Sequence, residues 1–383
     1  MPQATFQFPS GFLWGTATAA HQVEGNNHNN NWSAWEDQPG RILNGDKAGA
    51  ACDWWSGRWR EDFDRAKETH QNAHRLSIEW SRIQPTPDRW DEDALDQYRE
   101  MLRGLHERGI TPLVTLHHFT DPLWITERGG WENPETPALF EAYVRKAVDA
   151  LRAYCTWWIP INEPNVYAYS GYLGGAFPPG KNDPAAMARV LAALARGHGL
   201  AYRAIKSIQR EARVGTAVNL RYAQPAHGWL PVDRFFAHQM HQAYNASFLD
   251  TLVDGRFRFL ARTTRVPEAM GTYDFTGVNY YTGDLVTLDL GNPREIFMKR
   301  YYPPAAPLSD SGFIADWPEG LFHLLRWVHQ RYPGPIVITE NGLDDADDHL
   351  RPRYLIEHVH QVWRAINFSW PIRGYFHWSL VDN

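Results

Sequence analysis

Two short apolar runs of this chain each end in a glutamate: Trp157-Trp158-Ile159-Pro160-Ile161-Asn162-Glu163 and Pro335-Ile336-Val337-Ile338-Thr339-Glu340. Runs of this length and composition are typical of buried strands. In a barrel of parallel strands all carboxyl ends meet at one mouth, so carboxylates that are far apart in the sequence can face each other. The two runs therefore predict a barrel with Glu163 and Glu340 at its open end.

Similar runs recur along the rest of the chain. They are Phe12–Thr16, Arg75–Trp80, Leu113–His118, Val214–Asn219, Asp274–Tyr280 and Ile372–Trp378. Between them, apolar residues recur at helical spacing, for example at Leu95, Tyr98, Leu102 and Leu105. Strands that alternate with amphipathic helices pair in parallel, and eight of them predict a (β/α)8 TIM barrel. A doubly wound open sheet has the same local pattern, but its usual glycine-rich phosphate turn does not follow the first run.

The overall composition limits the number of domains, the partners and the location. The 383 residues contain no linker, which predicts one domain over residues 1–383. The net charge is −6, and Lys and Arg are scattered, which argues against nucleic acid or an anionic membrane as a partner. Because the first residues lack a leader pattern and no stretch of about eighteen apolar residues occurs, we expect a cytoplasmic location without membrane spans.

The residue types that usually bind metals show no suitable spacing. Cys52 and Cys155 are the only cysteines, and neither lies in a CxxC motif or a Cys/His cluster. The acidic run Asp344-Asp345-Ala346-Asp347-Asp348 lacks the glycine and the final glutamate of a calcium-binding loop, which favours a solvated acidic loop. The sequence thus predicts neither a metal nor another cofactor.

Several predicted strands end in polar side chains, which is where barrel enzymes carry their chemistry. These ends include His118, Glu163, Asn279 and Glu340. Simple exposure of strand ends to water would account for one or two of them but not for the set. Two opposed carboxyl groups are the minimum needed to hydrolyse a glycosidic bond. Glu24 and Glu79 also lie next to predicted strands, and we interpret them as structural partners of nearby arginines or backbone groups.

A series of motifs occurs in order from residue 11 to the end of the chain. They are Phe12-Leu13-Trp14-Gly15-Thr16, His21-Gln22-Val23-Glu24-Gly25, Leu116-His117-His118-Phe119, Asn162-Glu163-Pro164, Asn279-Tyr280-Tyr281, Thr339-Glu340-Asn341-Gly342 and Trp378-Ser379-Leu380. Together they resemble glycoside hydrolase family 1, which comprises β-glucosidases, β-galactosidases and 6-phospho-β-glycosidases built on a (β/α)8 barrel. The Asn-Glu-Pro motif alone is shared by several barrel glycosidase families, whereas the ordered set is specific.

This resemblance implies a role for each matching residue. Glu163 corresponds to the acid/base of the family and Glu340 to its nucleophile, while Arg75 and Tyr281 correspond to groups that contact the nucleophile. The side chains that grip the non-reducing sugar correspond to Gln22, His118, Asn162 and Trp378. The implied activity is that of a retaining exo-β-glycosidase of the β-glucosidase type, which acts on small β-glucosides or oligosaccharides by double displacement.

Elementary electrostatics supports opposite protonation states for the two glutamates. A guanidinium and a phenol beside Glu340 would stabilise its charged form. In retaining enzymes the two carboxyl groups lie about 5.5 Å apart, so their repulsion at an effective dielectric constant near 20 is roughly 3 kcal/mol, or about two pKa units. With some burial, this repulsion would keep Glu163 protonated and able to donate to the leaving oxygen.

The C-terminal end departs from the pattern of the family. The chain ends at Trp378-Ser379-Leu380-Val381-Asp382-Asn383, whereas family members continue with a Phe-Glu-Trp-type segment and an eighth helix. We therefore expect a barrel that lacks its final C-terminal helix. If that helix covered about 500 Å² of apolar surface, its burial would be worth at most ~12 kcal/mol. Either a second copy of the chain covers the gap between the eighth and first strands, as a homo-oligomer, or neighbouring segments have adapted.

Two other functions stay open at the level of the sequence. The first is a 6-phospho-β-glycosidase, but such members tend to follow the eighth strand with a Trp-Gly-type turn, whereas this chain has Trp378-Ser379-Leu380. The second is a catalytically weak barrel that binds a sugar or a partner. Relatives of that kind usually lose one catalytic glutamate, and both are present here.

Overall fold

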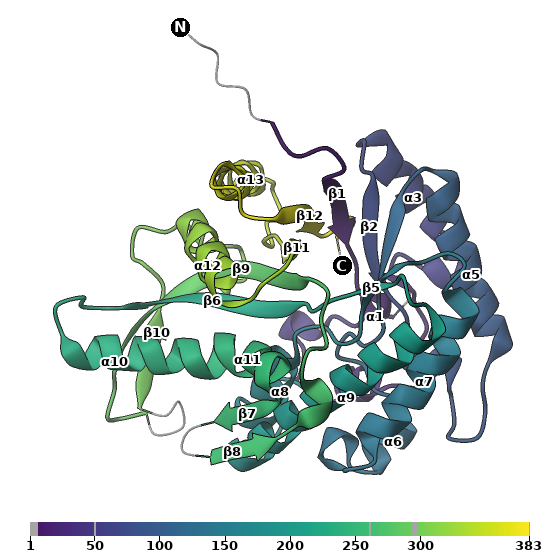
Figure 1. Ribbon diagram of the computed structural model, residues 1–383, viewed down its shortest axis with the longest axis horizontal. Coiled ribbons are helices and arrows are strands. Elements are labelled where there is room, and N and C mark those ends of the chain that lie inside the picture. Colours follow the sequence, from purple (N-terminus) through teal and green to yellow (C-terminus); the bar gives the residue numbers. More distant parts are fainter. Residues whose placement is uncertain (1–6, 50, 260–261, 293–296, 383) are drawn as a thin grey trace, which may run out of the picture.

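Parallel strands form the centre of the molecule (Figure 1), and their pairing order joins them into a ring. The computed structural model describes residues 7–49, 51–259, 262–292 and 297–382. In these residues the ring consists of β1 (Leu13–Ala17), β2 (Ala73–Ser77), β3 (Thr111–Thr115), β4 (Trp157–Ile159), β5 (Arg213–Val214) with β6 (Val218–Pro225), β9 (Thr276–Leu288), β11 (Ile336–Asn341) and β12 (Ile372–Trp378). The pairing of β12 with β1 closes the ring, and the chain folds as a (β/α)8 TIM barrel.

All eight predicted strands are present, but two of them differ in detail from the prediction. The fifth is divided into β5 and β6, which pair with opposite neighbours, β4 and β9. At the division the hydroxyl of Thr216 replaces a backbone group and accepts the N–H of Gly277 at 3.0 Å. The sixth strand, β9, extends to Leu288 and pairs outside the ring with the antiparallel strand β10 (Met298–Tyr301).

Amphipathic helices cover the outside of the ring. They are α3 (Trp59–Glu68), α5 (Glu92–Glu107), α7 (Thr136–Leu151), α9 (Pro184–Ile208), α11 (Ser247–Asp254), α12 (Pro318–Arg331) and α13 (Arg351–Asn367). The predicted apolar stripe of α5 is confirmed, since Leu95, Tyr98, Leu102 and Leu105 are all buried. This helix begins at a proper N-cap, where Asp91 accepts the N–H of Ala94 at 3.0 Å.

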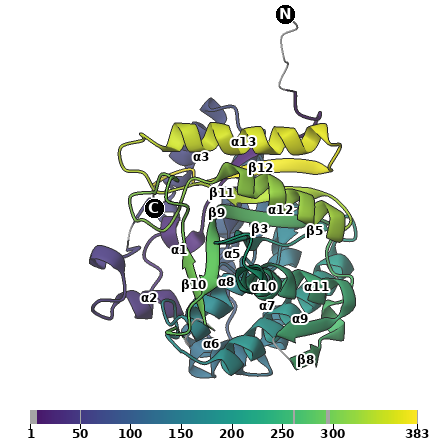
Figure 2. The ribbon, with the colours of Figure 1, turned by 90° about the vertical axis from the view of Figure 1, so that its left-hand side faces the viewer.

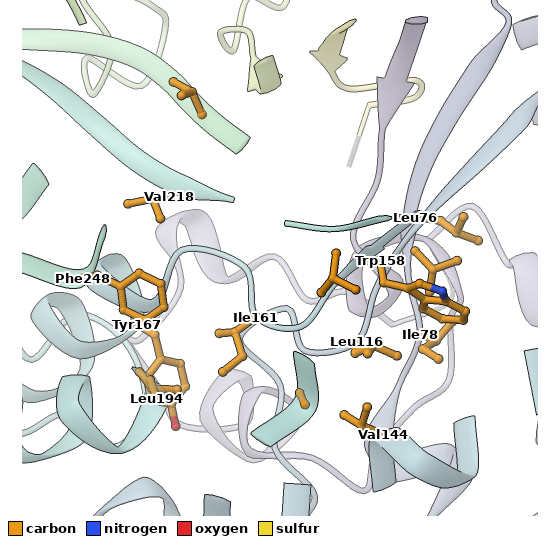
Figure 3. Packing of buried hydrophobic residues seen from close by; sticks show 14 of the residues in the cluster. Leu76, Ile78, Leu116, Val144, Trp158, Ile161, Tyr167, Leu194, Val218 and Phe248 are labelled. Carbon is orange, nitrogen blue, oxygen red and sulfur yellow. The ribbon is translucent and has the colours of Figure 1, made fainter. Parts of the chain in front are cut away.

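The core has two layers because side chains alternate along each strand. On β4, Trp157 and Ile159 point into the ring, where they pack with Phe275. The residue between them, Trp158, points outward to the helices, as Figure 3 shows together with Val144 of α7. The inner layer therefore fills part of the ring itself, and the outer layer joins the strands to the helices.

Shorter elements lie between the main ones. They are the helices α1 (Ala20–Val23), α2 (Asn31–Glu36), α4 (Trp80–Ile83), α6 (Leu123–Glu127), α8 (Pro164–Ala168) and α10 (Pro231–Met240), the π-helices η4 (Tyr169–Leu173) and η5 (His241–Ala246), the 3₁₀ turns η1 (Leu43–Gly45), η2 (Trp54–Ser56), η3 (Gly130–Glu132) and η6 (Pro267–Ala269), and the hairpin β7 (Arg256–Phe259) and β8 (Arg262–Arg265). The short helices α1 and α8 directly follow strands β1 and β4 and carry residues of the mouth.

An apolar groove runs along the outside of β1 and β12. In the described residues no helix follows β12, and α13 lies along one side of the strand (Figure 2). The groove has a volume of about 810 Å³, and its walls include Phe8, Trp14, Val359, Trp363 and Tyr375. This is the gap that the sequence predicted. Separately, no helix among the described residues is both long and apolar enough to cross a membrane.

Candidate active site

A cavity of about 750 Å³ opens at the mouth of the barrel. Among the residues predicted for the site, those that line it are Gln22, His118, Glu163, Tyr281, Glu340 and Trp378. Arg75 and Asn162 lie directly behind this wall, fully buried. The strand ends thus bring all eight predicted residues together from segments that span most of the sequence.

Glu340, the last residue but one of β11, is held by a cation and a phenol. Arg75 forms a buried ion pair with its Oε1, and the hydroxyl of Tyr281 donates to its Oε2 at 2.5 Å. Burial and the charge of Glu340 raise the pKa of Tyr281 well above its ordinary value, so the phenol keeps its proton and remains a donor. The arginine is itself positioned by Thr115, whose Oγ1 accepts from Nε at 3.0 Å. Both carboxylate oxygens of Glu340 are therefore oriented, and its charged form is stabilised.

Asn162 connects the two sides of the cavity. Its Oδ1 accepts from Arg75 Nη2 at 2.6 Å and from Asn279 Nδ2 at 3.2 Å. These two donors turn its Nδ2 towards His118, whose Nε2 lies 3.0 Å away. Burial, with the positive charge of Arg75, lowers the pKa of His118 well below its ordinary value, so the imidazole is neutral. The centroid of the His118 ring lies 5.6 Å from that of Trp378.

Glu163 occupies a strained position between β4 and α8. Its φ of 41° and ψ of 57° lie in the left-handed region, which costs a non-glycine residue about 1–3 kcal/mol. The backbone N–H of Glu163 donates to the carbonyl of Ala217 at 2.7 Å, and Pro164 starts the next helix. These constraints hold the carboxyl group at the wall of the cavity instead of in the sheet.

The surroundings of the Glu163 carboxyl group favour its protonated form. Burial, and after it the negative charge of Glu340, raises its pKa to about 8. The sequence predicted repulsion by Glu340 as the main cause, whereas burial is the larger one in the structure. Asn219 and Asn279 each donate to its Oε1 at 2.9 Å, which partly offsets the rise in pKa. The Glu163 carboxyl group, with its raised pKa, thus faces the same cavity as the ion-paired Glu340.

The other strand-adjacent carboxylates do not line the cavity. Glu24 pairs with Arg82 at 2.7 Å and accepts the hydroxyl of Tyr98 at 2.7 Å. Glu79 accepts the hydroxyl of Thr120 at 2.8 Å. Their interpretation as structural side chains is confirmed, although the partners of Glu79 are neutral groups.

The acidic run after β11 also departs from its prediction. Asp344, Asp347 and Asp348 are exposed, as expected for a solvated loop. Asp345 is buried instead, and its Oδ2 accepts the N–H groups of Leu350 and Arg351 at the start of α13. A carboxylate is favourable there because the first N–H groups of a helix lack partners within the helix. In the described residues, no group of three or more His, Cys, Asp or Glu side chains is arranged to hold a metal ion.

The cavity wall also contains residues that were not expected from the sequence. They include Trp32, Tyr169, Leu173, Phe177, Asn219, Met240, Tyr244, Met298 and Phe313. Asn219 ends a predicted strand, so the strand-end argument could have found it. Tyr244 lies within a π-helix, and no periodicity of the sequence marks it.

Comparisons with known proteins agree with this geometry. The sequence model described as glycosyl hydrolase family 1 matches residues 4–383. The chain is 32% identical to the 1,4-beta-D-glucan glucohydrolase of Thermotoga neapolitana, over 98% of this chain and 94% of that protein. It is 33% identical to beta-glucosidase A of Thermotoga maritima, over 98% of this chain and 90% of that protein.

The three-dimensional comparison covers the whole barrel. The solved structure of the family 1 b-glucosidase from Thermotoga maritima superposes with a TM-score of 0.94 at 33% identity, covering 100% of this chain and 90% of that one. Agreement of sequence and fold over the full chain, with both glutamates at the mouth, leads to one assignment. The chain is a glycosidase and belongs to glycosyl hydrolase family 1.

Proposed function

We propose that residues 1–383 form a single-domain retaining exo-β-glucosidase, in which Glu340 is the nucleophile and Glu163 the acid/base. One observation carries the assignment of roles. Glu340 is held by Arg75 and Tyr281, which stabilise an ionised carboxylate. Glu163 has a pKa raised to about 8 and so holds a proton at neutral pH. Retaining hydrolysis requires this pair of opposite protonation states.

In the first step, an oxygen of Glu340 attacks the anomeric carbon of a terminal β-D-glucosyl residue. The bond from this carbon to the leaving-group oxygen breaks, and Glu163 gives its proton to that oxygen. The product is a covalent glycosyl ester of Glu340. Since the ester is neutral, the repulsion that contributes to the raised pKa of Glu163 disappears, and its pKa falls.

In the second step, Glu163 acts as a base. It takes a proton from a water molecule whose oxygen attacks the anomeric carbon, and the ester bond to Glu340 breaks. The sugar leaves with its original anomeric configuration, and both glutamates return to their starting states. We propose that Gln22, His118 and Trp378 bind the glucosyl unit. The amide of Asn162 would donate to the sugar 2-hydroxyl, a contact that strengthens in the transition state.

A 2-deoxy-2-fluoro-β-glucoside with a dinitrophenyl leaving group should trap the covalent intermediate. The fluorine slows both steps, and the good leaving group keeps the first step fast enough to accumulate the ester. We expect release of one dinitrophenol per chain, with the glucosyl label on the peptide that contains Glu340. Mass spectrometry of a digest measures both. A label on another residue would reject the assigned nucleophile, and no label would favour a barrel that only binds sugars.

The pH profile of kcat/KM should have a basic limb near pH 8. The active form of the free enzyme holds the proton on Glu163, and its pKa is raised to about 8. Activity is therefore retained below this pH and falls about tenfold per unit above it. The measurement is the hydrolysis of a nitrophenyl β-glucoside in buffers of constant ionic strength. A basic limb near the ordinary pKa of glutamate, instead of near pH 8, would show that Glu163 is not the acid.

One of the cations in the described cavity wall is already paired with a carboxylate, which makes it less suited to bind a 6-phosphate. The described cavity wall contains two cationic side chains, Arg221 and Arg300. Arg221 is engaged by Asp284 through two hydrogen bonds, of 2.6 and 2.8 Å. A homo-oligomer that covers the groove between β12 and β1, and a cytoplasmic location, both stay predictions from the sequence.

A further inference from the structure

The carboxyl group of Glu163 has two oxygens in different surroundings. Oε1 accepts hydrogen bonds from Asn219 Nδ2 and Asn279 Nδ2, both at 2.9 Å. The hydrogen bonds found among the described residues leave Oε2 without a partner. A carboxyl oxygen has two lone pairs in its plane, so an oxygen that accepts two N–H groups has no place for a proton. The proton of the acid form is therefore confined to Oε2.

Each of the two asparagines is itself oriented by a hydroxyl group. Thr339 Oγ1 donates to Asn279 Oδ1 at 2.6 Å, and the hydroxyl of Tyr244 donates to Asn219 Oδ1 at 3.0 Å. The orientation of a carboxamide is set by its hydrogen bonds. When its oxygen accepts from a fixed hydroxyl group, its N–H groups point to the opposite side. Without Tyr244, the amide of Asn219 could rotate and present its oxygen to Glu163. That oxygen would accept a proton from Oε1, on the wrong side of the carboxyl group.

The position of Tyr244 is built into the backbone. It lies on η5, and π-helices occur frequently at functional sites. Asn165, two residues after Glu163, donates from Nδ2 to the carbonyls of both Asn219 and Tyr244, at 2.7 and 3.2 Å. Asn245 pairs with the N–H and the carbonyl of Arg221, at 2.9 and 2.8 Å. These bonds attach η5 to β6 and place the phenol over the carboxamide.

We propose that Tyr244 and Asn219 form a positioning pair, in which Tyr244 orients Asn219 and Asn219 keeps the proton of Glu163 on Oε2, the oxygen that faces the leaving group. This proposal rests on the proposed role of Glu163 as acid/base. Tyr244 and Asn219 line the cavity, but their part is to act through Glu163 rather than on the sugar. Burial raises the pKa of Tyr244, so it remains a donor at every pH at which the enzyme works.

The pair has two measurable consequences. A poor leaving group needs a proton from Glu163 on its oxygen, whereas a good one leaves without it. A misplaced proton should therefore slow the hydrolysis only of glucosides with a poor leaving group. The N–H of Asn219 also favours the ionised form of Glu163, so its loss should move the basic limb to higher pH. The other groups that act on Glu163 are unchanged by these substitutions, namely Glu340 of β11, Asn279 and Tyr281 of β9 and Arg75 of β2.

The test compares Asn219→Ala and Tyr244→Phe with the unchanged enzyme, on phenyl and 2,4-dinitrophenyl β-glucosides across the pH range. For Asn219→Ala we expect kcat/KM to fall about 10- to 100-fold on the phenyl glucoside, a part of what general acid catalysis supplies. On the dinitrophenyl glucoside, kcat/KM should change by less than about threefold. The basic limb of the pH profile should move to higher pH. Tyr244→Phe should show the same pattern with a smaller loss, because Asn219 is still present but no longer oriented.

The matched control is Tyr202→Phe. This phenol lies on α9, outside the cavity wall, and donates to Asp274 at 2.8 Å. Its loss removes one hydrogen bond but should alter neither the leaving-group dependence nor the basic limb. A loss in Asn219→Ala and Tyr244→Phe that is equal for both leaving groups, with the basic limb unmoved, would overturn the proposal.

Glu163→Gln, measured in parallel, separates this proposal from the proposed function. If Glu163→Gln keeps the basic limb of the unchanged enzyme, Glu163 is not the acid, and both proposals fail. If Glu163→Gln loses the limb while Asn219→Ala leaves it in place, only the positioning pair is rejected. Tyr244→Phe keeps the ring in place, so it serves as the test if Asn219→Ala does not fold.

Discussion

Glu340→Gln should lower kcat for a nitrophenyl β-glucoside by on the order of 10⁵- to 10⁶-fold, the scale seen when a covalent nucleophile is removed. The amide has nearly the shape of the carboxylate, but it has no charge with which to form the glycosyl ester. Arg75 and Tyr281 lie in contact with both oxygens of Glu340, so the loss should reflect chemistry rather than a change in substrate binding. KM should therefore change far less than kcat.

The matched control for this substitution is Glu107→Gln. Glu107 is exposed at the end of α5, where it lies 3.7 Å from Arg103, and the same chemical change there should leave kcat unaltered. Thermal unfolding of both variants shows whether the folded state persists. Addition of azide to Glu340→Gly should restore turnover and yield the α-glucosyl azide, because the anion then attacks directly in the vacant space. Residual activity above about one per cent in Glu340→Gln would refute the assignment of the nucleophile.

Glu163→Ala should lower kcat/KM by about 10²- to 10⁴-fold on an alkyl β-glucoside, whose leaving oxygen needs a proton. On a 2,4-dinitrophenyl β-glucoside the same variant should form the glycosyl ester at nearly the normal rate. Breakdown of the ester should then become slow, because no base activates the water. The result is a burst of dinitrophenol followed by a slow steady state, which stopped-flow absorbance measures.

A small anion can replace the missing base in this variant. Azide needs no deprotonation, so it should speed the second step of Glu163→Ala and give the β-glucosyl azide. The anomeric configuration of the azide product therefore distinguishes the two glutamates, since the Glu340 variant gives the opposite anomer. If Glu163→Ala lost activity equally on both leaving groups and did not respond to azide, the roles proposed here would be wrong.

Much of this fold could be predicted because its signals are local. Each strand is an apolar run, and each covering helix such as α5 has a stripe at helical spacing, so periodicity alone indicates their order. The boundaries of the strands depend on more than the local sequence. The fifth strand divides at Thr216 and β9 extends to Leu288, because in both places the partner strand, not the local sequence, decides where pairing continues.

The candidate site was predictable to the extent that it follows from strand ends and motifs. All eight predicted side chains lie at or directly behind the cavity wall. A raised pKa of Glu163 was also expected, but its larger cause, burial, is a property of the folded chain. Other residues of the cavity wall, such as Phe177 and Tyr244, gave no local signal, because they belong to loops and irregular helices.

The sequence by itself determined the barrel, the pair of glutamates and the family, because apolar periodicity and ordered motifs are written in consecutive residues. Only the tertiary structure decided which oxygen of Glu163 accepts the N–H groups of the two asparagines. That outcome depends on Asn219, Asn279 and Tyr244, which lie on separate elements and meet only after the ring has closed. The hydrogen-bond geometry of a carboxyl group is set by atoms in space, and neighbouring positions in the chain carry no record of it.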